Sequence, residues 1–355
     1  MFSFRTTPIS EQLDKALLDG KVGVFCTHNA WDPISGQYLY ELFRKRGNLA
    51  GIFLPAESEL SSEESHIEFD IDEIKGLNAI VVEIQDVGSR YFSHTVDVLR
   101  LMSSLRILGE DAPSLYVVDH FNPAGRTVEG TIPTVSRDVW TPLVAHRHGL
   151  TLGELCHLYH NEIDAKYPLH IISASASAYG KILMPWSIAP SSDVPGVFTA
   201  LMYSGGALWK GSSITPGTGT ARPFEYIGAP FLKPGESSSL PVPEGVMMRW
   251  CNFTPSYGMY EGEKCFGYQI MLAPGTEYHS LLHTLQLMKF FQKRYSQFTL
   301  SEEFYAMVAD PVIESFFKDD LSFDIVQEHI KTEEQKWIRK AKRFVLYDDM
   351  PCRIK

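Results

Sequence analysis

Residues 115–130 read LYVVDHFNPAGRTVEG, an apolar run that leads directly into a polar loop. The first four residues are apolar and partly β-branched, which favours a buried strand, and Pro123, Ala124 and Gly125 then indicate a turn. In open α/β sheets, ligands bind where strands end. We therefore predict a ligand-binding edge here, although an ordinary solvated crossover loop would explain the position equally well. The polar residues of the loop are Asp119, His120, Asn122, Arg126 and Glu129.

Length and composition are those of a globular protein large enough for two domains. The chain has 355 residues, of which 44% are hydrophobic and 21% charged. Single cores usually stop growing below this length. The formal net charge of -11 argues against a polyanionic partner, because phosphate binding needs surplus Lys and Arg. We expect no nucleic-acid partner.

No segment of the sequence has the pattern of a secretory signal or a membrane span. Charged residues interrupt the first 21 positions, and no apolar run approaches about eighteen residues. We expect a soluble protein that is cytoplasmic, or periplasmic if a signal peptide has been removed. The sequence does not specify an oligomeric state.

The residue types that bind metals do not form a convincing cluster. The five cysteines are scattered and contain no CxxC pair, so neither a disulfide framework nor a cysteine zinc site is expected. His146 and His148 are two residues apart, for which a structural role is favoured over metal ligation. No metal and no other cofactor is predicted.

Apolar periodicity predicts alternating strands and helices through the first 150 residues. Strands are expected at 22–26, 51–54, 79–84 and 115–118, and helices at 9–18, 38–46, 71–75 and 91–108. This alternation is typical of a parallel sheet with right-handed crossovers. The predicted fold class is α/β, a Rossmann-like parallel sheet with helices on both faces plus a smaller α+β C-terminal domain. No GxGxxG motif follows the first strand, which leaves a nucleotide-dependent enzyme as a weak third hypothesis.

The pattern changes near residue 150, where we place the boundary between a Rossmann-like N-terminal domain, 1–150, and a C-terminal α+β domain, 151–355. Thr151 and Glu154 form a capping-box pattern at the start of a helix. A loop-rich region at 181–234 is dense in Gly, Pro, Ser and Thr, and such a segment packs its own side chains or holds a ligand. Strands at 247–253 and 267–272 and helices at 278–295 and 332–343 are predicted beyond it.

Three polar constellations carry candidate chemistry. Each could equally form structural ion pairs, which are common and individually weak. Arginine offers a bidentate fork to a carboxylate, and glycine-rich backbone lets a ligand approach closely. The first constellation contains Glu83, Gln85, Asp86, Gly88, Arg90 and Tyr91; the second contains Asn122, Arg126 and Glu129 with His146, Arg147 and His148; the third contains Arg222 and Glu225 in a glycine-rich loop.

Glu129 is a candidate general acid. A carboxyl group held beside apolar residues has a raised pKa, which suits an acid catalyst. A neighbouring arginine such as Arg126 or Arg147 would lower that pKa instead. The sequence leaves open whether Glu129 reacts or only pairs with an arginine.

The three segments IQDVGSRYF, VDHFNPAGRTVEG with HRHGLTLGEL, and GTGTARPFEYIGAPF resemble the signature segments of the NamZ family. The resemblance extends from about residue 22 to at least residue 269. It implies a Rossmann-like domain, a smaller second domain and a cleft between them. It also implies exo-β-N-acetylmuramidase activity, the release of terminal N-acetylmuramic acid from peptidoglycan fragments, and hence a muramic-acid-containing saccharide as the partner.

The resemblance implies a catalytic pair of glutamates, one in a Pro-Glu-His-Gly loop and one in a Val-Glu-Gly motif. Glu129 matches the second. In the first, Ala56 stands at the glutamate position and Glu57 follows one residue late. Asn29 belongs to a partly matched motif after the first strand. Further departures from the family pattern are Lys210, Ser213, Thr218 and Asp193.

These matches and departures support two principal hypotheses. The preferred one is a glycoside hydrolase with Glu129 as acid and Glu57 as second carboxylate, because glycosidases normally use two carboxyl groups. Glu83, Asp119 or the N-acetyl group of the sugar could replace Glu57. The four arginines Arg90, Arg126, Arg147 and Arg222 would bind the lactyl carboxylate or orient the acids. The alternative is a catalytically silent protein of the same fold that binds a carbohydrate or cell-wall fragment.

Overall fold

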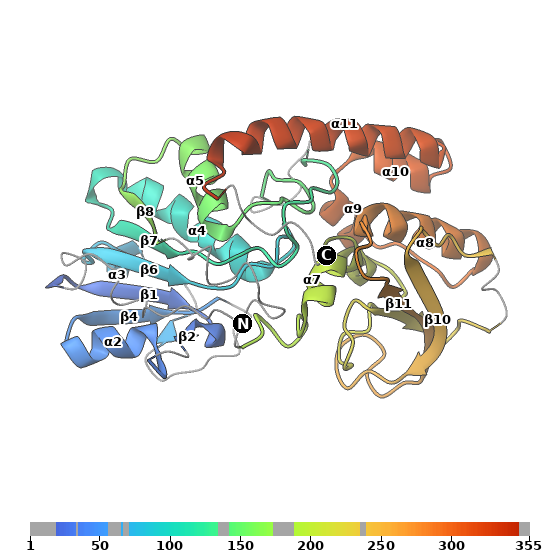
Figure 1. Ribbon diagram of the computed structural model, residues 1–355, viewed down its shortest axis with the longest axis horizontal. Helices are drawn as coiled ribbons and strands as arrows, with labels where there is room; N and C mark the ends of the chain where they lie inside the picture. The colour runs from blue at the N-terminus through green and yellow to red at the C-terminus, as the bar shows by residue number, and fades with distance from the viewer. Residues whose placement is uncertain are drawn as a thin grey trace.

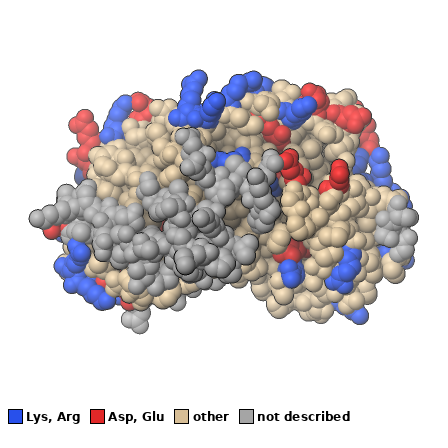
Figure 2. Space-filling model, in the orientation of Figure 1, with Lys and Arg blue, Asp and Glu red and all other residues tan. Residues whose placement is uncertain are grey.

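The structure is a computed structural model that describes residues 19–32, 35–55, 65–66, 71–133, 142–172, 188–234 and 239–347. The helix predicted at 9–18 lies outside these residues. No helix among the described residues is both long and apolar enough to cross a membrane. On the face shown in Figure 2, the described Lys and Arg side chains are interspersed with Asp and Glu rather than gathered into one basic surface.

A six-stranded parallel sheet forms one half of the molecule (Figure 1). Its strands lie in the order β5-β4-β1-β6-β7-β8. Numbered by their sequence order within the sheet, they run 3-2-1-4-5-6, the order of the doubly wound dinucleotide-binding fold. Their bounds are β1 Val22–Cys26, β4 Leu49–Phe53, β5 Ser65–His66, β6 Ala79–Glu83, β7 Ser114–Val118 and β8 Leu169–Ile172.

Alternate residues of these strands enter two separate cores, because successive side chains of a strand point to opposite faces. Val24 and Val81 belong to the core on the side of helix α2 (Leu39–Arg46). Phe25 and Val82 belong to the core that contains α4 (Ser93–Leu108) and α5 (Leu152–Glu162). Helices therefore cover both faces, as Figure 1 shows, and the predicted fold class is confirmed.

A smaller antiparallel sheet lies in the other half of the molecule. Its order is β10-β11-β9, formed by Tyr226–Ala229 (β9), Val246–Phe253 (β10) and Cys265–Leu272 (β11). The neighbouring helices are α7 (Val197–Gly206), α8 (Ser280–Arg294), α9 (Glu302–Val308) and α10 (Pro311–Phe317). Residues of this sheet and of these helices share one hydrophobic core.

Helix α11 (Phe323–Ala341) connects the two halves (Figure 1). Val326 and Ile330 pack into the core of the smaller sheet, whereas Trp337 and Ala341 pack into the α4–α5 core of the large sheet. The indole Nε1 of Trp337 donates a hydrogen bond of 2.8 Å to the carbonyl oxygen of His148. One amphipathic helix thus contributes to both cores.

Three sequence-based expectations differ from the structure. The domain boundary at residue 150 falls inside the segment that builds the large sheet, since α5 and β8 follow it and β8 pairs with β7. The region at 181–234, predicted to be rich in loops, contains α7 and β9 among its described residues. The last helix was predicted at 332–343. It begins nine residues earlier, at Phe323, and ends two residues earlier, at Ala341.

Candidate active site

The large sheet has a topological switch point between β1 and β6. The chain that leaves β1 forms α2 on one face and returns as β4, whereas the chain that leaves β6 forms α4 on the other face and returns as β7. The two connections diverge, which leaves a crevice at the carboxyl ends of these neighbouring strands. Ligands of open α/β sheets bind in such crevices.

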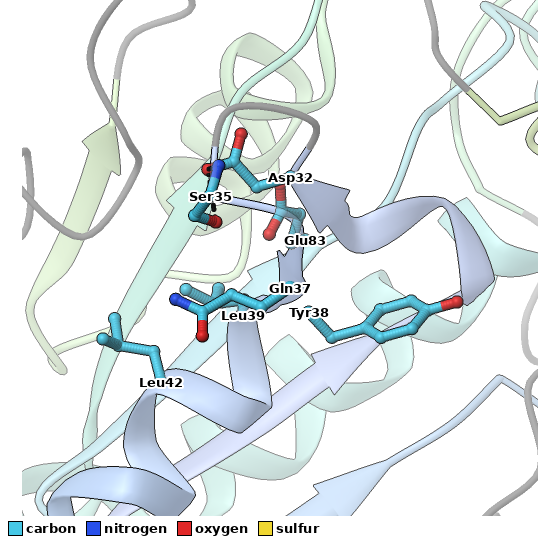
Figure 3. A pocket seen from close by; sticks show the side chains of 7 residues that line it. All are labelled: Asp32, Ser35, Gln37, Tyr38, Leu39, Leu42 and Glu83. Atoms are coloured by element: carbon cyan, nitrogen blue, oxygen red, sulfur yellow. Dashed lines mark hydrogen bonds between the residues drawn. The ribbon is translucent and has the colours of Figure 1, made fainter.

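A hollow lies at this point (Figure 3). Its empty space, open solvent included, is ≈ 240 Å³, which is less than small-molecule sites usually have. A short hairpin of β2 (Trp31–Asp32) and β3 (Gln37–Tyr38) forms one wall. The lining residues are Asp32, Ser35, Gln37, Tyr38, Leu39, Leu42 and Glu83.

The hairpin presents an ordered carboxylate to the hollow. Asp32 Oδ2 accepts hydrogen bonds from Ser35 Oγ at 2.9 Å and from Ser35 N at 3.3 Å. The backbone N of Tyr38 donates to Glu41 Oε2 at 2.7 Å, which caps the start of α2. Asp32 is therefore held by a local turn, and it is 6% exposed.

Glu129 occupies a different place. Its carboxylate is fully buried and forms an ion pair of 2.7 Å with Arg147 Nη1. Ser280 N and Ser280 Oγ donate to it at 3.0 and 2.6 Å, and Leu281 N donates at 3.0 Å. These donors belong to the first turn of α8, where the helix dipole favours a negative charge. Glu129 is not among the residues that line the hollow.

Arg90 and Arg147 donate to backbone carbonyls inside the protein. Arg147 is 1% exposed and donates to the carbonyl of Tyr278 at 3.4 Å and to that of Leu201. Arg90 is 3% exposed and donates to the carbonyls of Met307 and Val308 at 2.6 and 2.9 Å. Both arginines connect the loops of the large sheet to the other half of the chain.

Tyr91 and His146 belong to the same network. The Tyr91 hydroxyl lies 2.5 Å from His146 Nδ1, and Arg90 Nη2 lies 3.2 Å from His146 Nε2. Burial, together with the positive charge of Arg90, holds the pKa of His146 well below its ordinary value. A neutral imidazole is therefore expected between the arginine and the phenol. Burial also raises the pKa of Tyr91 to about 12.

The remaining residues of the first two constellations order the loops. Gln85 Nε2 donates to the carbonyls of Asp86 and Phe121 at 2.7 and 2.8 Å. Asp86 accepts from Gly88 N at 2.7 Å and lies 3.3 Å from His148 Nε2. Asn122, which also lies against Gly88, donates to the carbonyl of Leu150 and accepts from the N–H of Ala124, each at 2.9 Å.

Arg126 is paired with Glu154. Both terminal nitrogens of Arg126 contact the Glu154 carboxylate, and Nη2 also donates to the carbonyl of Tyr347 at 2.7 Å. Burial alone would raise the pKa of Glu154, but the hydrogen bonds from Arg126, Thr151 and Leu346 hold it below the ordinary value. This bidentate pair fixes α5 to the loop after β7 and to the C-terminal segment.

Arg222 is the most accessible of the four predicted arginines. Its side chain is 52% exposed while Nη1 contacts Glu225 Oε2 at 3.0 Å. Thr199 Oγ1 donates to the other oxygen of Glu225 at 3.2 Å.

Two predicted residues remain. Asn29 accepts from Thr27 Oγ1 at 2.8 Å just beyond β1. Glu57 lies outside the described residues.

Most of the predicted site residues hold loops together at the carboxyl edge of the sheet. The hollow is lined by other residues, apart from Glu83. The sequence placed Glu83 in the first constellation and among the possible substitutes for Glu57, but it did not point to Asp32, Ser35, Gln37 or Tyr38. A signal for them existed, since a polar stretch follows the first strand directly, but a two-residue strand pair has no periodicity to detect.

An α/β chain with this strand order and a polar hollow at its switch point has the architecture of a ligand-binding or catalytic α/β protein. Comparison with known proteins narrows the class. Residues 63–196 match the N-terminal model and residues 201–347 the C-terminal model of the family described as exo-beta-N-acetylmuramidase NamZ. The chain belongs to the NamZ family and is a divergent member of it.

Relatives agree with this assignment. The peptidoglycan beta-N-acetylmuramidase NamZ of Bacillus subtilis (strain 168) is 25% identical over 288 residues, which are 77% of this chain and 68% of the relative. Two solved DUF1343 family proteins from Bacteroides fragilis NCTC 9343 have TM-scores of 0.79 and 0.75, each at 18% identity. They cover 96% and 95% of this chain, and this chain covers 97% of each, so the whole fold is shared.

Proposed function

We propose that this protein is a glycoside hydrolase that releases terminal N-acetylmuramic acid from peptidoglycan fragments. The observation that carries the proposal is that both halves of the chain match the two parts of one exo-β-N-acetylmuramidase family. The hollow at the switch point supports it, because two carboxyl groups, those of Asp32 and Glu83, are among its lining.

The site residues are assigned within this proposal. Arg222, with its half-exposed guanidinium, is the candidate to bind the lactyl carboxylate of muramic acid through a charge-assisted pair. The catalytic roles of Glu129 and Glu57 stay predictions. Four donors surround the buried Glu129 carboxylate, which favours a positioning role through Arg147 and α8. Such a group would hold the loops of the crevice in place.

The alternative of a silent binding protein is not favoured. Its motivation was the set of departures at Ala56, Lys210, Ser213 and Thr218. Two of these departures have structural roles here: Lys210 lies over the Phe224 ring, and Ser213 Oγ donates to the carbonyl of Gln297 at 3.0 Å. Substitutions that serve packing do not imply loss of catalysis, whereas the family match spans both halves of the chain.

A chromogenic aryl β-N-acetylmuramide tests the function directly. The purified protein should release the chromophore, and it should release free N-acetylmuramic acid from a muramic-acid-terminated disaccharide, as followed by chromatography. The matched glycoside without the lactyl group, an aryl β-N-acetylglucosaminide, should be cleaved much more slowly. Binding of the muramic-acid compounds without turnover would instead establish the silent binding protein.

A further inference from the structure

Glu83 breaks the apolar pattern of its strand. Along β6, Ala79, Val81 and Glu83 alternate on the face that α2 covers, and the first two belong to the core on that side. The third position would continue this core if it were apolar. It instead carries a carboxyl group that is 3% exposed and that lies beside Cys26 of β1 in the register of the sheet.

One oxygen of Glu83 is left for a ligand. Oε1 lies 3.6 Å from His120 Nε2, at the end of the adjacent strand β7. Oε2 is buried and has no hydrogen-bond partner among the described residues. Buried polar atoms are nearly always paired, and an exception points to a missing partner. Because Glu83 lines the hollow, that partner can be a bound molecule (Figure 3).

The other candidate substitute, Asp119, is already occupied. Its Oδ1 accepts from His120 N at 3.0 Å and from Gly153 N at 2.8 Å. Its Oδ2 accepts from Thr151 Oγ1 at 2.6 Å. Asp119 thus caps the N-terminus of α5, whereas Glu83 Oε2 accepts no hydrogen bond within the part of the chain that the structure describes.

A second carboxyl group faces the same hollow. Figure 3 shows Asp32 and Glu83 at the end of the hollow away from Leu39 and Leu42. Glycoside hydrolysis normally uses two carboxyl groups that flank the scissile bond. Asp32 comes from the hairpin after β1 and Glu83 from the end of β6, so the two switch-point strands each supply one.

We propose that Glu83 is the catalytic general acid of the glycosidase, with Asp32 as the second carboxyl group; this rests on the function proposed above. The bond between the anomeric carbon and the glycosidic oxygen breaks, and the leaving oxygen takes the proton from Glu83. A water molecule forms the new bond to the anomeric carbon. Its surplus proton is released to solvent, from which Glu83 is protonated again. His120 is a positioning residue that holds Oε1.

Leaving-group dependence distinguishes this role from a structural one. The Glu83→Gln variant keeps the shape of the side chain but cannot deliver a proton. For a muramic-acid-terminated disaccharide, whose leaving alcohol needs protonation, kcat should fall on the order of 10²–10⁴-fold. For the 4-nitrophenyl glycoside, whose leaving group needs little help, the fall should be much smaller. The acidic group that governs the high-pH limb of the disaccharide profile should also disappear.

The pH profile depends on the other titratable groups that face Glu83. These are Asp32 on β2, Tyr38 on β3, Cys26 on β1 and His120 after β7. The Asp310→Asn variant is the matched control, because Asp310 is an equally buried carboxylate that caps α10 in the other half of the molecule. The activity of this control variant on each substrate, and the pH dependence of that activity, should equal those of the wild type.

The outcomes separate the two proposals. A wild type that cleaves neither substrate overturns the function and the role of Glu83 together. An active wild type whose folded Glu83→Gln variant loses equal activity on both substrates, or none, overturns the role of Glu83 alone. If that variant does not fold by circular dichroism, Glu83→Asp keeps the carboxyl group on a shorter chain. Its loss must again be larger for the disaccharide, and an equal loss on both substrates overturns the role.

Discussion

Glu129 and Arg147 are joined twice, by a side-chain ion pair of 2.7 Å and by two backbone hydrogen bonds of 3.0 and 3.1 Å. Both side chains are essentially inaccessible to solvent. Glu129 also accepts from the first turn of α8, while Arg147 donates to the carbonyl of Tyr278, just before α8, and to that of Leu201 in α7. The pair therefore connects the loop after β7 to the smaller half of the molecule. This geometry suits a pair that holds the loops around the crevice in place better than one that reacts with a substrate.

Replacing Glu129 with Gln should strongly destabilise the fold. The change leaves the Arg147 guanidinium buried without its counter-charge, and breaking such a pair costs about 3–5 kcal/mol. Urea unfolding followed by tryptophan fluorescence would measure the loss. Glu110→Gln, at an exposed turn, is the control and should change the free energy of unfolding by less than about 0.5 kcal/mol. A stable, folded and inactive Glu129→Gln protein would restore Glu129 as a catalytic acid.

His279 should make stability fall at alkaline pH. Burial alone would lower its pKa, but the carboxylates of Glu129 and Glu334 raise it above the ordinary 6.5. A raised histidine pKa stabilises the fold below the unfolded value, and this stabilisation is lost as pH rises through the folded value. The free energy of unfolding should therefore decline from pH 6.5 upward. Glu334→Gln removes the 2.8 Å partner and should move the histidine titration, followed by NMR, to lower pH.

Much of the fold could be predicted because its strands are continuous apolar runs. Buried on both faces, β1, β6 and β7 need no long-range information to be recognised, and each was predicted to within a residue at either end. The elements in the second half of the chain were harder to predict from such patterns. Gly205 and Gly211 approach the backbone of Ser280 and Phe304 closely, so small residues that look like loop are in fact packing surfaces.

The candidate site was harder to predict than the fold. Sequence patterns identify polar residues at strand ends but do not tell which of them pair with one another. Arg90 and Arg126 donate to groups more than 200 residues away in the chain, which no local pattern reveals. Glu83 could be noticed as a carboxylate within a strand, but only the tertiary structure shows that its Oε2 has no hydrogen-bond partner among the described residues.

The contribution of Asp119 to the free energy of unfolding should decrease as the pH rises from acid to neutral. Burial raises its pKa from 3.8 to about 6, although the hydrogen bonds from Thr151 and Gly153 act in the opposite direction. A raised carboxyl pKa means that the folded state binds the proton more tightly, so the stabilisation that Asp119 contributes is fully present below pH 3.8 and is lost as pH rises through about 6. A tenfold difference in proton affinity between the folded and unfolded states corresponds to about 1.4 kcal/mol.

The Asp119→Asn variant isolates this contribution. Asparagine stays neutral and can still accept from the N-terminus of α5, so the variant should lack the decline between pH 3.8 and 6 and should be the more stable protein at neutral pH. Unfolding free energies across this range would measure the difference between the two proteins. Parallel curves for wild type and variant would show that Asp119 titrates normally in the fold.

Gly130 should be irreplaceable by alanine. It follows Glu129 with φ at +86°, and a Cβ built on it would lie 2.3 Å from His146 Cδ2 and 2.6 Å from Leu281 Cδ2. Both neighbours are buried, so neither can move without disturbing the Glu129 cluster. Strained backbone and overpacking each cost about 1–3 kcal/mol. Gly130→Ala should therefore lower the thermal midpoint by many degrees.

Gly76→Ala is the control. Gly76 is exposed and has nothing within 4 Å of its Cβ position, so this substitution should be neutral or slightly stabilising. Equal thermal midpoints for the two variants would contradict the close packing around Gly130.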